Sequence, residues 1–414
     1  MFKALIKFLK NKPLNPLLQL NWRRTLKVNR LKACLDRFRE ILLLSAVLLA
    51  WGVSAYAKTV DLSGQVSAWV TVRSDDTQVG LRYIPELSFA RQLWETYEIS
   101  AEAAAKIQWF SRYDDEWDRI EKDSDVDSYR LWVRFASSQY EARAGLQKIS
   151  FGSATLLRPL MWFDSIDPRD PLQLTDGVYG LLGRYYFLNN ANIWLWGLYG
   201  NDDLKGWETI PSYEREIEFG GRVQMPVPAG EMGLSYHHRR VNPKGSVFGA
   251  QYPAQGKFPE QRIGLDGKWD IGVGLWLEGT VTRQDLDVPA PRYQKLFTVG
   301  TDYTFDIGNG PHLLLEQFVG VETKNLFGSG DSQSISALLA DYPLSLLDTV
   351  SAIVYYDWEI DNWSGFLTWR RSYDQWQIHL SAFRNPDRAT ITQDTTTGSS
   401  FSGNGVQLML VFNH

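Results

Sequence analysis

The feature that most constrains this chain is a series of about eighteen short stretches in which apolar and polar residues alternate. They run from Leu62 to Phe412, and turns and longer polar segments separate them. A period of two places alternate side chains on opposite faces of a β-strand. A tilted strand needs about 9–11 residues to cross a bilayer, and only a closed barrel pairs every strand backbone group there. The pattern predicts an all-β chain that forms a transmembrane antiparallel β-barrel of about 18 strands.

The alternation also predicts which side chains face inward. In one stretch Leu131 and Val133 alternate with Arg130 and Arg134. A charge on the lipid face near the midplane costs about 2–4 kcal/mol, so the polar face must line the interior. Strands are expected to begin near residues 62, 79, 96, 127, 139, 177, 191, 216, 231, 260, 273, 294, 310, 333, 348, 363, 374 and 404.

The connections predict the topology. An even number of strands places both termini on one side, which in bacterial barrels is the periplasm. Counted from there, the expected periplasmic turns are short, as at Ser137-Ser138, Asn189-Asn190 and Asp374-Gln375. The expected extracellular loops are mostly longer, at about 114–126, 150–176, 202–215, 242–259, 285–293, 323–332 and 386–403. Two connections on that side, near Asp75 and Asp361, are short.

The first 57 residues have the features of a secretory signal peptide. Lys and Arg are frequent from Met1 to Arg39, an apolar run follows from Ile41 to Trp51, and Ala55-Tyr56-Ala57 forms an A-x-A site. Cleavage after Ala57 would leave residues 58–414 as the barrel. The alternative is a signal anchor that stays attached, although the run is shorter than the roughly 20 residues of a membrane span.

The charge balance limits the partners. Residues 1–57 hold 11 of the 43 Lys and Arg and 2 of the 48 Asp and Glu, which leaves 32 basic and 46 acidic residues, a net charge of −14. An acidic chain argues against nucleic acid as a partner. The single cysteine, Cys34, lies in the leader. We expect neither a cofactor nor a metal site: Asp123, Asp125 and Asp127 begin a calcium-loop spacing, but Ser128 stands where the loop needs glycine.

A soluble β-sandwich or propeller is the structural alternative, because it also contains alternating strands. Neither fold would alternate short turns with long loops, and the sequence shows no blade-length repeat of the kind that a propeller has.

The chain resembles bacterial outer-membrane porins in the Ala55-Tyr56-Ala57 site, in the strand ladder and in the closing stretch 405–412. Porins commonly end on a phenylalanine that the barrel-assembly machinery reads, whereas Phe412 is followed by two residues. The segment 143–163, leading into 164–171, resembles the strand and loop region of larger substrate-specific porins. The strand number is similar to that of alginate-export and sugar-specific porins. The resemblance implies an outer-membrane channel that contacts lipid and lipopolysaccharide. Trimers are common in the family, so the resemblance also allows a homo-oligomer.

Ten charged residues are expected to line the pore and to set its selectivity. The basic ones fall on the first third of the barrel and the acidic ones on later strands, which would set opposed walls of opposite sign across the lumen. Guanidinium groups bind carboxylates, sulfates and phosphates in bidentate fashion; the alternative is that these charges form ion pairs that stiffen the barrel. The ten are Arg82, Lys106, Arg130, Arg134, Arg143, Arg184, Glu278, Asp302, Glu316 and Asp357.

The longest loop, about 150–177, is predicted to constrict the lumen. Its apolar residues 156, 157 and 160–163 would be costly in water, which favours a loop that folds inward and packs on the barrel wall. The alternative is a loop that covers the mouth or contacts another subunit. Its charged residues are Arg158, Asp164, Asp167, Arg169 and Asp170. A second loop, 114–126, is strongly acidic and is expected to be a solvated outer loop near lipopolysaccharide.

We expect a porin, not an enzyme, for passive diffusion of small hydrophilic solutes. One alternative is a dedicated channel for an anionic oligo- or polysaccharide, and another is an adhesin or receptor. A barrel hydrolase would place a His and a Ser two apart on one strand, as His379 and Ser381 or Ser235 and His237 are. Both pairs are predicted to face the lumen, where a lipid ester does not lie.

Overall fold

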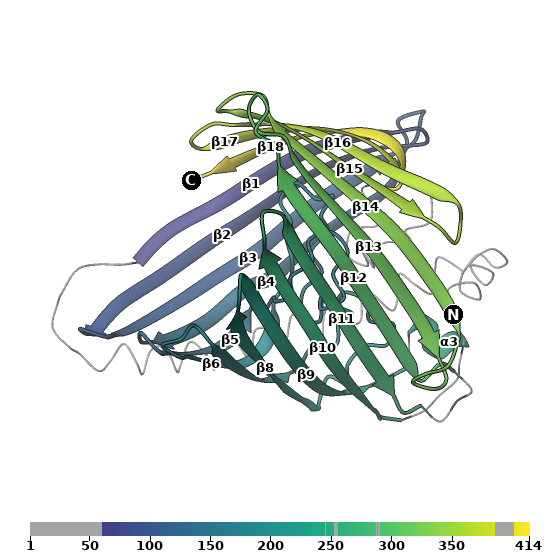
Figure 1. Ribbon diagram of the computed structural model, residues 1–414. Helices are drawn as coiled ribbons and strands as arrows, with labels where there is room; N and C mark the ends of the chain where they lie inside the picture. The colour runs from purple at the N-terminus through teal and green to yellow at the C-terminus, as the bar shows by residue number, and fades with distance from the viewer. Residues whose placement is uncertain (1–59, 245, 252–255, 287, 289, 386–400) are drawn as a thin grey trace. The chain divides into compact units, whose positions relative to one another are not determined.

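A computed structural model describes residues 60–414 except 245, 252–255, 287, 289 and 386–400. The predicted signal peptide, residues 1–57, lies outside the described residues. The described chain forms eighteen antiparallel strands that pair in sequence order, and β1 (Val60–Arg73) pairs with both β2 (Thr77–Trp94) and β18 (Gly403–Asn413), so the sheet closes into a barrel (Figure 1). The predicted fold class and strand number are confirmed.

The predicted strand starts lie within two residues of the observed ones, with one exception. The remaining elements are β3 (Tyr97–Tyr113), β4 (Arg119–Ala136), β5 (Tyr140–Gln147), β6 (Val178–Tyr186), β7 (Asn192–Tyr199), β8 (Ile217–Val227), β9 (Gly230–Val241), α3 (Val247–Gln251), β10 (Phe258–Asp270), β11 (Gly274–Gln284), β12 (Tyr293–Thr304), β13 (His312–Thr323), β14 (Asp331–Pro343), β15 (Asp348–Asp357), β16 (Asn362–Ser372) and β17 (Trp376–Asn385).

The exception is β4, which begins at Arg119 instead of near residue 127. The prediction of an acidic outer loop over 114–126 was therefore wrong, because only 114–118 connect β3 to β4. The two strands have 17 and 18 residues, well beyond what a membrane crossing needs. Arg112 pairs with Glu121 at 3.3 Å across this hairpin, so the acidic run is held in a β-ladder by a basic partner.

The outward alternation of the strands is apolar. Exposed side chains on it include Val70, Leu195, Leu265 and Leu408, which suits contact with hydrocarbon. Aromatic pairs lie near the ends of the strands, where amphipathic rings favour the membrane interface. They are Phe135 with Tyr140, Tyr185 with Phe187, Tyr303 with Phe305 and Trp376 with Phe412 at one end, and Tyr113 with Trp117 and Tyr356 with Trp358 at the other.

The two ends of the barrel differ in their connections. We call the end where β1 begins and β18 ends the short-turn end, and the opposite one the long-loop end. At the short-turn end Gly64 and His414 exchange two backbone hydrogen bonds of 3.0 Å, which complete the seam. The two longest fully described connections, 148–177 and 200–216, both belong to the long-loop end. No helix among the described residues is long and apolar enough to span a membrane.

Apolar side chains also fill part of the barrel interior. One cluster joins Leu156 and Leu157 of the 148–177 connection to inward residues of β11 through β17, among them Phe318 and Ile335. A second cluster joins the same connection, through residues such as Trp162, to β6 and β7. The core therefore lies between the barrel wall and this connection.

Candidate functional site

All ten residues predicted to line the pore lie on the inward-facing alternation of their strands, but they divide into groups with different surroundings. Three arginines converge near the short-turn end, three cations lie against the 148–177 connection, and the four acidic residues lie apart from one another.

The arginine cluster consists of Arg134, Arg143 and Arg184 around the carboxylate of Glu141. The register places Arg134 opposite Arg143 and Glu141 opposite Arg184 on β4, β5 and β6. The nitrogen-to-oxygen distances to Glu141 are 3.1 Å from Arg134, 3.2 Å from Arg143 and 3.5 Å from Arg184. Arg134 also reaches Glu98 at 3.0 Å. One buried carboxylate is thus shared by three guanidinium groups.

Aromatic rings orient two of these arginines. The guanidinium carbon of Arg184 lies 3.8 Å from the centre of the Trp194 ring, and that of Arg143 lies 4.6 Å from the Trp132 ring. Stacking of this kind fixes the plane of the guanidinium and leaves its edge N–H groups available. The side chains of Arg134, Arg143 and Arg184 are 28%, 20% and 16% exposed, so they remain accessible from the lumen.

Arg82, Lys106 and Arg130 lie against the connection between β5 and β6. Lys106 Nζ pairs with Asp176 at 2.7 Å, and Arg130 donates to the backbone oxygen of Thr175 at 3.0 Å. Arg82 stacks over Trp69 at 5.5 Å. The contacts of Lys106 and Arg130 hold the returning end of the connection against β3 and β4.

The inner loop, which we define as residues 148–177, packs against inward-facing residues of the barrel wall. Its Leu157, Leu160 and Trp162 side chains are almost fully buried. Leu172 packs near inward residues of β1, β3 and β18. The loop therefore reaches wall strands on several sides of the interior.

The five charged residues expected in this loop are mostly paired within it. Arg158 forms a two-pronged contact with Asp164 at 2.8 and 3.2 Å, and Arg169 pairs with Asp167 at 2.7 Å. Burial raises the pKa of Asp170 above its ordinary value, although the nearby Arg82 guanidinium acts in the opposite direction. These groups fix the shape of the loop more than they offer free charge.

The four acidic residues lie at different positions along the barrel axis and have different hydrogen-bond partners. Asp302 contacts His312 at 3.4 Å towards the short-turn end, whereas Asp357 accepts from Gln333 at 3.0 Å towards the long-loop end. Glu278 and Glu316 are 0% and 3% exposed and accept hydrogen bonds from backbone N–H groups of the inner loop. The later strands thus present separate acidic positions in a largely apolar wall instead of one acidic layer.

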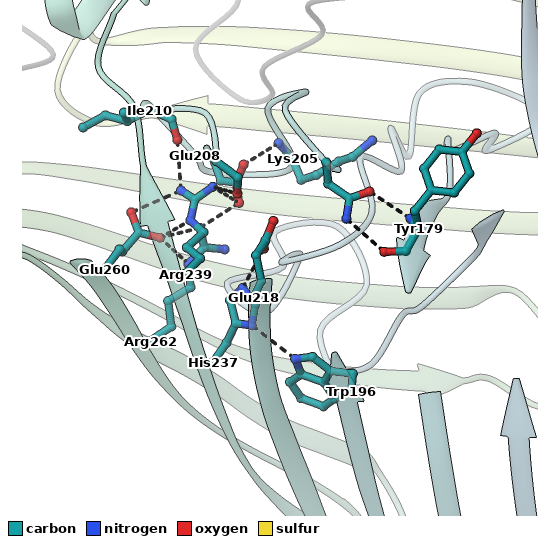
Figure 2. Close-up of polar contacts among 12 residues, drawn as sticks. Tyr179, Trp196, Lys205, Glu208, Ile210, Glu218, His237, Arg239, Glu260 and Arg262 are labelled. Carbon is teal, nitrogen blue, oxygen red and sulfur yellow. Dashed lines mark hydrogen bonds and ion pairs between the residues drawn. The ribbon is translucent and has the colours of Figure 1, made fainter. Parts of the chain in front are cut away.

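A buried charge network on β9 and β10 was missed by the sequence reasoning. We define it as Arg239, Arg262, Glu208 and Glu260, and Figure 2 shows Arg239 at its centre. Arg239 pairs with Glu260 at 2.5 Å and with Glu208 at 2.9 Å, and Arg262 pairs with the same two carboxylates at 2.6 and 2.7 Å. Two cations and two anions balance within it.

Glu208 belongs to a second inner loop, residues 200–216. Trp207 of this loop donates to the backbone oxygen of Arg158 at 2.9 Å and stacks on Phe318 at 4.7 Å. The two inner loops therefore support each other inside the barrel. Strand alternation signals that Arg239 and Glu260 face inward, but no local pattern shows that a loop carboxylate joins them.

The His and Ser residues that a barrel hydrolase would use are hydrogen-bonded to other side chains of the barrel. His237 accepts from Trp196 at its Nδ1 and lies 3.1 Å from Glu218 through its Nε2, as Figure 2 shows. Ser235 accepts from Arg222 at 3.1 Å, and Ser381 lies 2.9 Å from Thr368. In the part of the chain that the structure describes, no group of three or more His, Cys, Asp or Glu residues is arranged to hold a metal.

Comparisons with known proteins show the fold. No protein-family model matches this sequence. No curated protein matches it either. Solved structures do match: OccK5 (OpdH) of Pseudomonas aeruginosa has a TM-score of 0.54 at 12% identity, over 87% of this chain and 99% of that one. The fold is that of the outer-membrane porins.

Two further structures agree with it. OccD3 (OpdP) of Pseudomonas aeruginosa has a TM-score of 0.53 at 11% identity, over 87% of this chain and 93% of that one. OccAB2 of Acinetobacter baumannii has a TM-score of 0.52 at 7% identity, over 87% and 99%. At these identities the likeness establishes the barrel architecture and carries no information on the solute.

Proposed function

We propose that the protein is a porin of the bacterial outer membrane through which small hydrophilic solutes diffuse passively. The observation that carries this proposal is a closed eighteen-stranded barrel with an apolar outer face and partly exposed arginines inside. A water-filled lumen lined by fixed charge selects solutes by size and by sign. No catalytic step is part of the proposal, because the paired His and Ser residues serve the barrel's own contacts.

The narrowest part of the path is proposed to be formed by the inner loop, and the arginine cluster is proposed to favour anions. Three guanidinium groups offer more N–H donors than Glu141 and Glu98 can accept, so donors remain for a passing carboxylate, sulfate or phosphate. Arg82, Lys106, Arg130 and the acidic residues contribute to the same electrostatic profile along the lumen.

The orientation and the partners follow from the same proposal. The short-turn end, with both ends of the barrel sheet, would face the periplasm, and the long-loop end would face lipopolysaccharide. Residues 1–57 would direct export, and the barrel-assembly machinery would insert the barrel. A homo-oligomer is compatible with this arrangement.

The test is single-channel recording of the refolded chain 58–414 in a planar bilayer, with the reversal potential measured in a salt gradient. We expect steady current with anion preference. A correctly folded barrel that passes no current at any voltage would contradict the proposed function.

A further inference from the structure

Two inward carboxylates hold one stretch of the inner loop through its backbone. Glu278 lies on β11 and Glu316 on β13, and the stretch is 153–160. Glu278 accepts from the backbone N–H groups of Leu160 at 2.6 Å, Ser153 at 2.7 Å and Ala154 at 2.9 Å. All three donors therefore come from the same short segment of the loop.

Glu316 has a matching set of donors. It accepts from the backbone N–H groups of Thr155 at 2.6 Å, Leu157 at 2.7 Å and Leu156 at 3.0 Å, and from the Trp276 indole at 3.0 Å. Consecutive N–H groups directed at one anion form a concave site of the kind that binds anions in many proteins. Here the anions belong to the barrel wall, and the loop supplies the concave site.

The burial of these carboxylates argues against a role as pore charges. Leu156 and Leu157 cover this part of the wall and pack with Phe318 and Ile335 in the interior apolar cluster. A solute in the lumen would meet the loop before it met either carboxylate. Asp302, in contrast, has a side chain that is 27% exposed.

The loop also supplies the hydrogen-bond donors that the two buried carboxylates of the barrel wall need. A buried carboxylate without hydrogen-bond donors is strongly unfavourable, and the wall around Glu316 is built of apolar residues such as Leu314 and Phe318. The loop supplies six of the seven donors described above. Docking of the loop and burial of the carboxylates therefore stabilise each other.

Gly152 permits the close approach. A Cβ atom there would lie 2.3 Å from a carboxylate oxygen of Glu278, and the glycine has a φ of +107°, which disfavours other residues. A side chain at this position would push the loop and the carboxylate apart without changing any charge.

We propose that Glu278 and Glu316 are positioning residues that hold the inner loop on the wall, and so set the aperture of the pore and not its preference for anions or cations. This proposal rests on the proposed porin function for its electrical consequence. Its structural part, retention of the loop, is independent of transport.

The first experiment measures retention of the loop by trypsin cleavage after Arg169, in the refolded chain 58–414. Proline follows Arg158, so Arg169 is the cleavable basic residue of this loop after Lys148. The variants are E278Q/E316Q and G152A, and the control is D302N, which removes an inward charge away from the loop contacts. We expect cleavage after Arg169 about tenfold faster in the first two variants, because they populate the released loop, and unchanged in the control. Equal rates in all proteins would overturn the proposal.

The second experiment records single channels of the same variants. We expect E278Q/E316Q and G152A to alter conductance and to add brief closures at an unchanged reversal potential, and D302N to shift the reversal potential with steady current. If E278Q/E316Q shifts the reversal potential as D302N does while G152A has no effect, the carboxylates are pore charges and the proposal is wrong. G152A leaves every strand intact, so it tests the loop even if the double variant does not fold. Faster cleavage in barrels that carry no current would reject the porin function and keep the loop-holding role.

Discussion

The arginine cluster and the buried charge network use the same residue types to opposite effect. In the cluster, three partly exposed arginines share Glu141, with Glu98 at its edge. In the network, two arginines face two carboxylates, and Arg239 and Glu260 are each only 1% exposed. The cluster has unused donors in contact with the lumen, whereas in the network Nε and both Nη atoms of Arg239 have partners.

The difference shows that the number of arginines inside a barrel does not predict its selectivity. A guanidinium acts on a solute only where local carboxylates leave it unbalanced and where water reaches it. Substitutions in the two regions therefore distinguish an arginine that stabilises the barrel from one that acts on a solute.

The largest effect is expected for Arg239→Ala. Removal of this guanidinium leaves Glu260 and Glu208 buried with one remaining cation, which should lower the free energy of unfolding by about 3–5 kcal/mol. Denaturant titration of the refolded barrel in detergent measures it. Arg240→Ala is the matched control, because Arg240 is the exposed next residue of β9. A loss below about 1 kcal/mol for Arg239→Ala is the range of a surface ion pair. It would show that the network stabilises the barrel no more than the partly exposed arginine cluster does.

Asp176→Asn should have an intermediate effect. The Asp176 side chain is 39% exposed, so water screens its pair with Lys106 and the expected loss of stability is about 1 kcal/mol at neutral pH. Burial alone would raise the pKa of Asp176, but the Lys106 ammonium outweighs it and lowers that pKa below its ordinary value.

A depressed pKa gives this effect a defined pH dependence. The stabilisation by Asp176 is fully present above its unfolded pKa of about 3.9 and is lost as the pH falls through the lowered folded pKa. Denaturant titrations between pH 7 and pH 2 should show the parent and the variant converging at the acid end. A difference that persists unchanged at pH 2 would show that the carboxylate charge is not its source.

Arg134→Ala combined with Arg184→Ala should lower the free energy of unfolding by about 1 kcal/mol or less, because Arg143 still pairs with Glu141 and leaves no carboxylate of the cluster without a cation. The reversal potential should move towards cation preference, since two of the three cluster cations are gone. Lys257→Ala removes an exposed cation that pairs with Glu216 at 2.6 Å, and it should leave the reversal potential unchanged. Equal shifts from the two proteins would mean that overall charge, and not the cluster, sets the selectivity.

The smallest effect is expected for Glu141→Gln, which removes one charge from the cluster. Its reversal potential should move in the opposite direction, towards stronger anion preference, while stable current continues. Recording in a salt gradient at two ionic strengths checks both the sign and the screening, because higher salt should reduce the shift. A shift towards cations would contradict the assignment of the cluster as the anion-preferring element.

The strands were predictable because a period of two residues is a local property of the sequence. Leu131 and Val133 identify the outward face of β4 without knowledge of any other strand, and the inward position of Arg134 follows. The start of β4 was not predictable in this way, because residues 119–126 are polar and gain their β-structure from pairing with Arg112 and its neighbours on β3.

The partners of the inward charges were not predictable for a different reason. Which inward charges meet depends on the register and on the path of the loops, and the convergence of three arginines on Glu141 needs three strands to align. Glu208 and the backbone donors of 153–160 belong to loops, whose paths have no periodic signal. The sequence therefore identified inward residues and missed which of them are neutralised.

The seam between β1 and β18 has a consequence for the order of assembly. Gln65 donates to Asn413 at 3.1 Å, although 348 positions separate them in the chain. Contacts between residues so distant in sequence form slowly, and until they form both edge strands keep unpaired backbone groups that attract other chains. Docking of the inner loop is delayed as well, because the loop is synthesised more than a hundred residues before Glu278 and Glu316, the carboxylates that bind it. A chain truncated before Gly403 would thus contain both of its inner loops and still remain an open, aggregation-prone sheet.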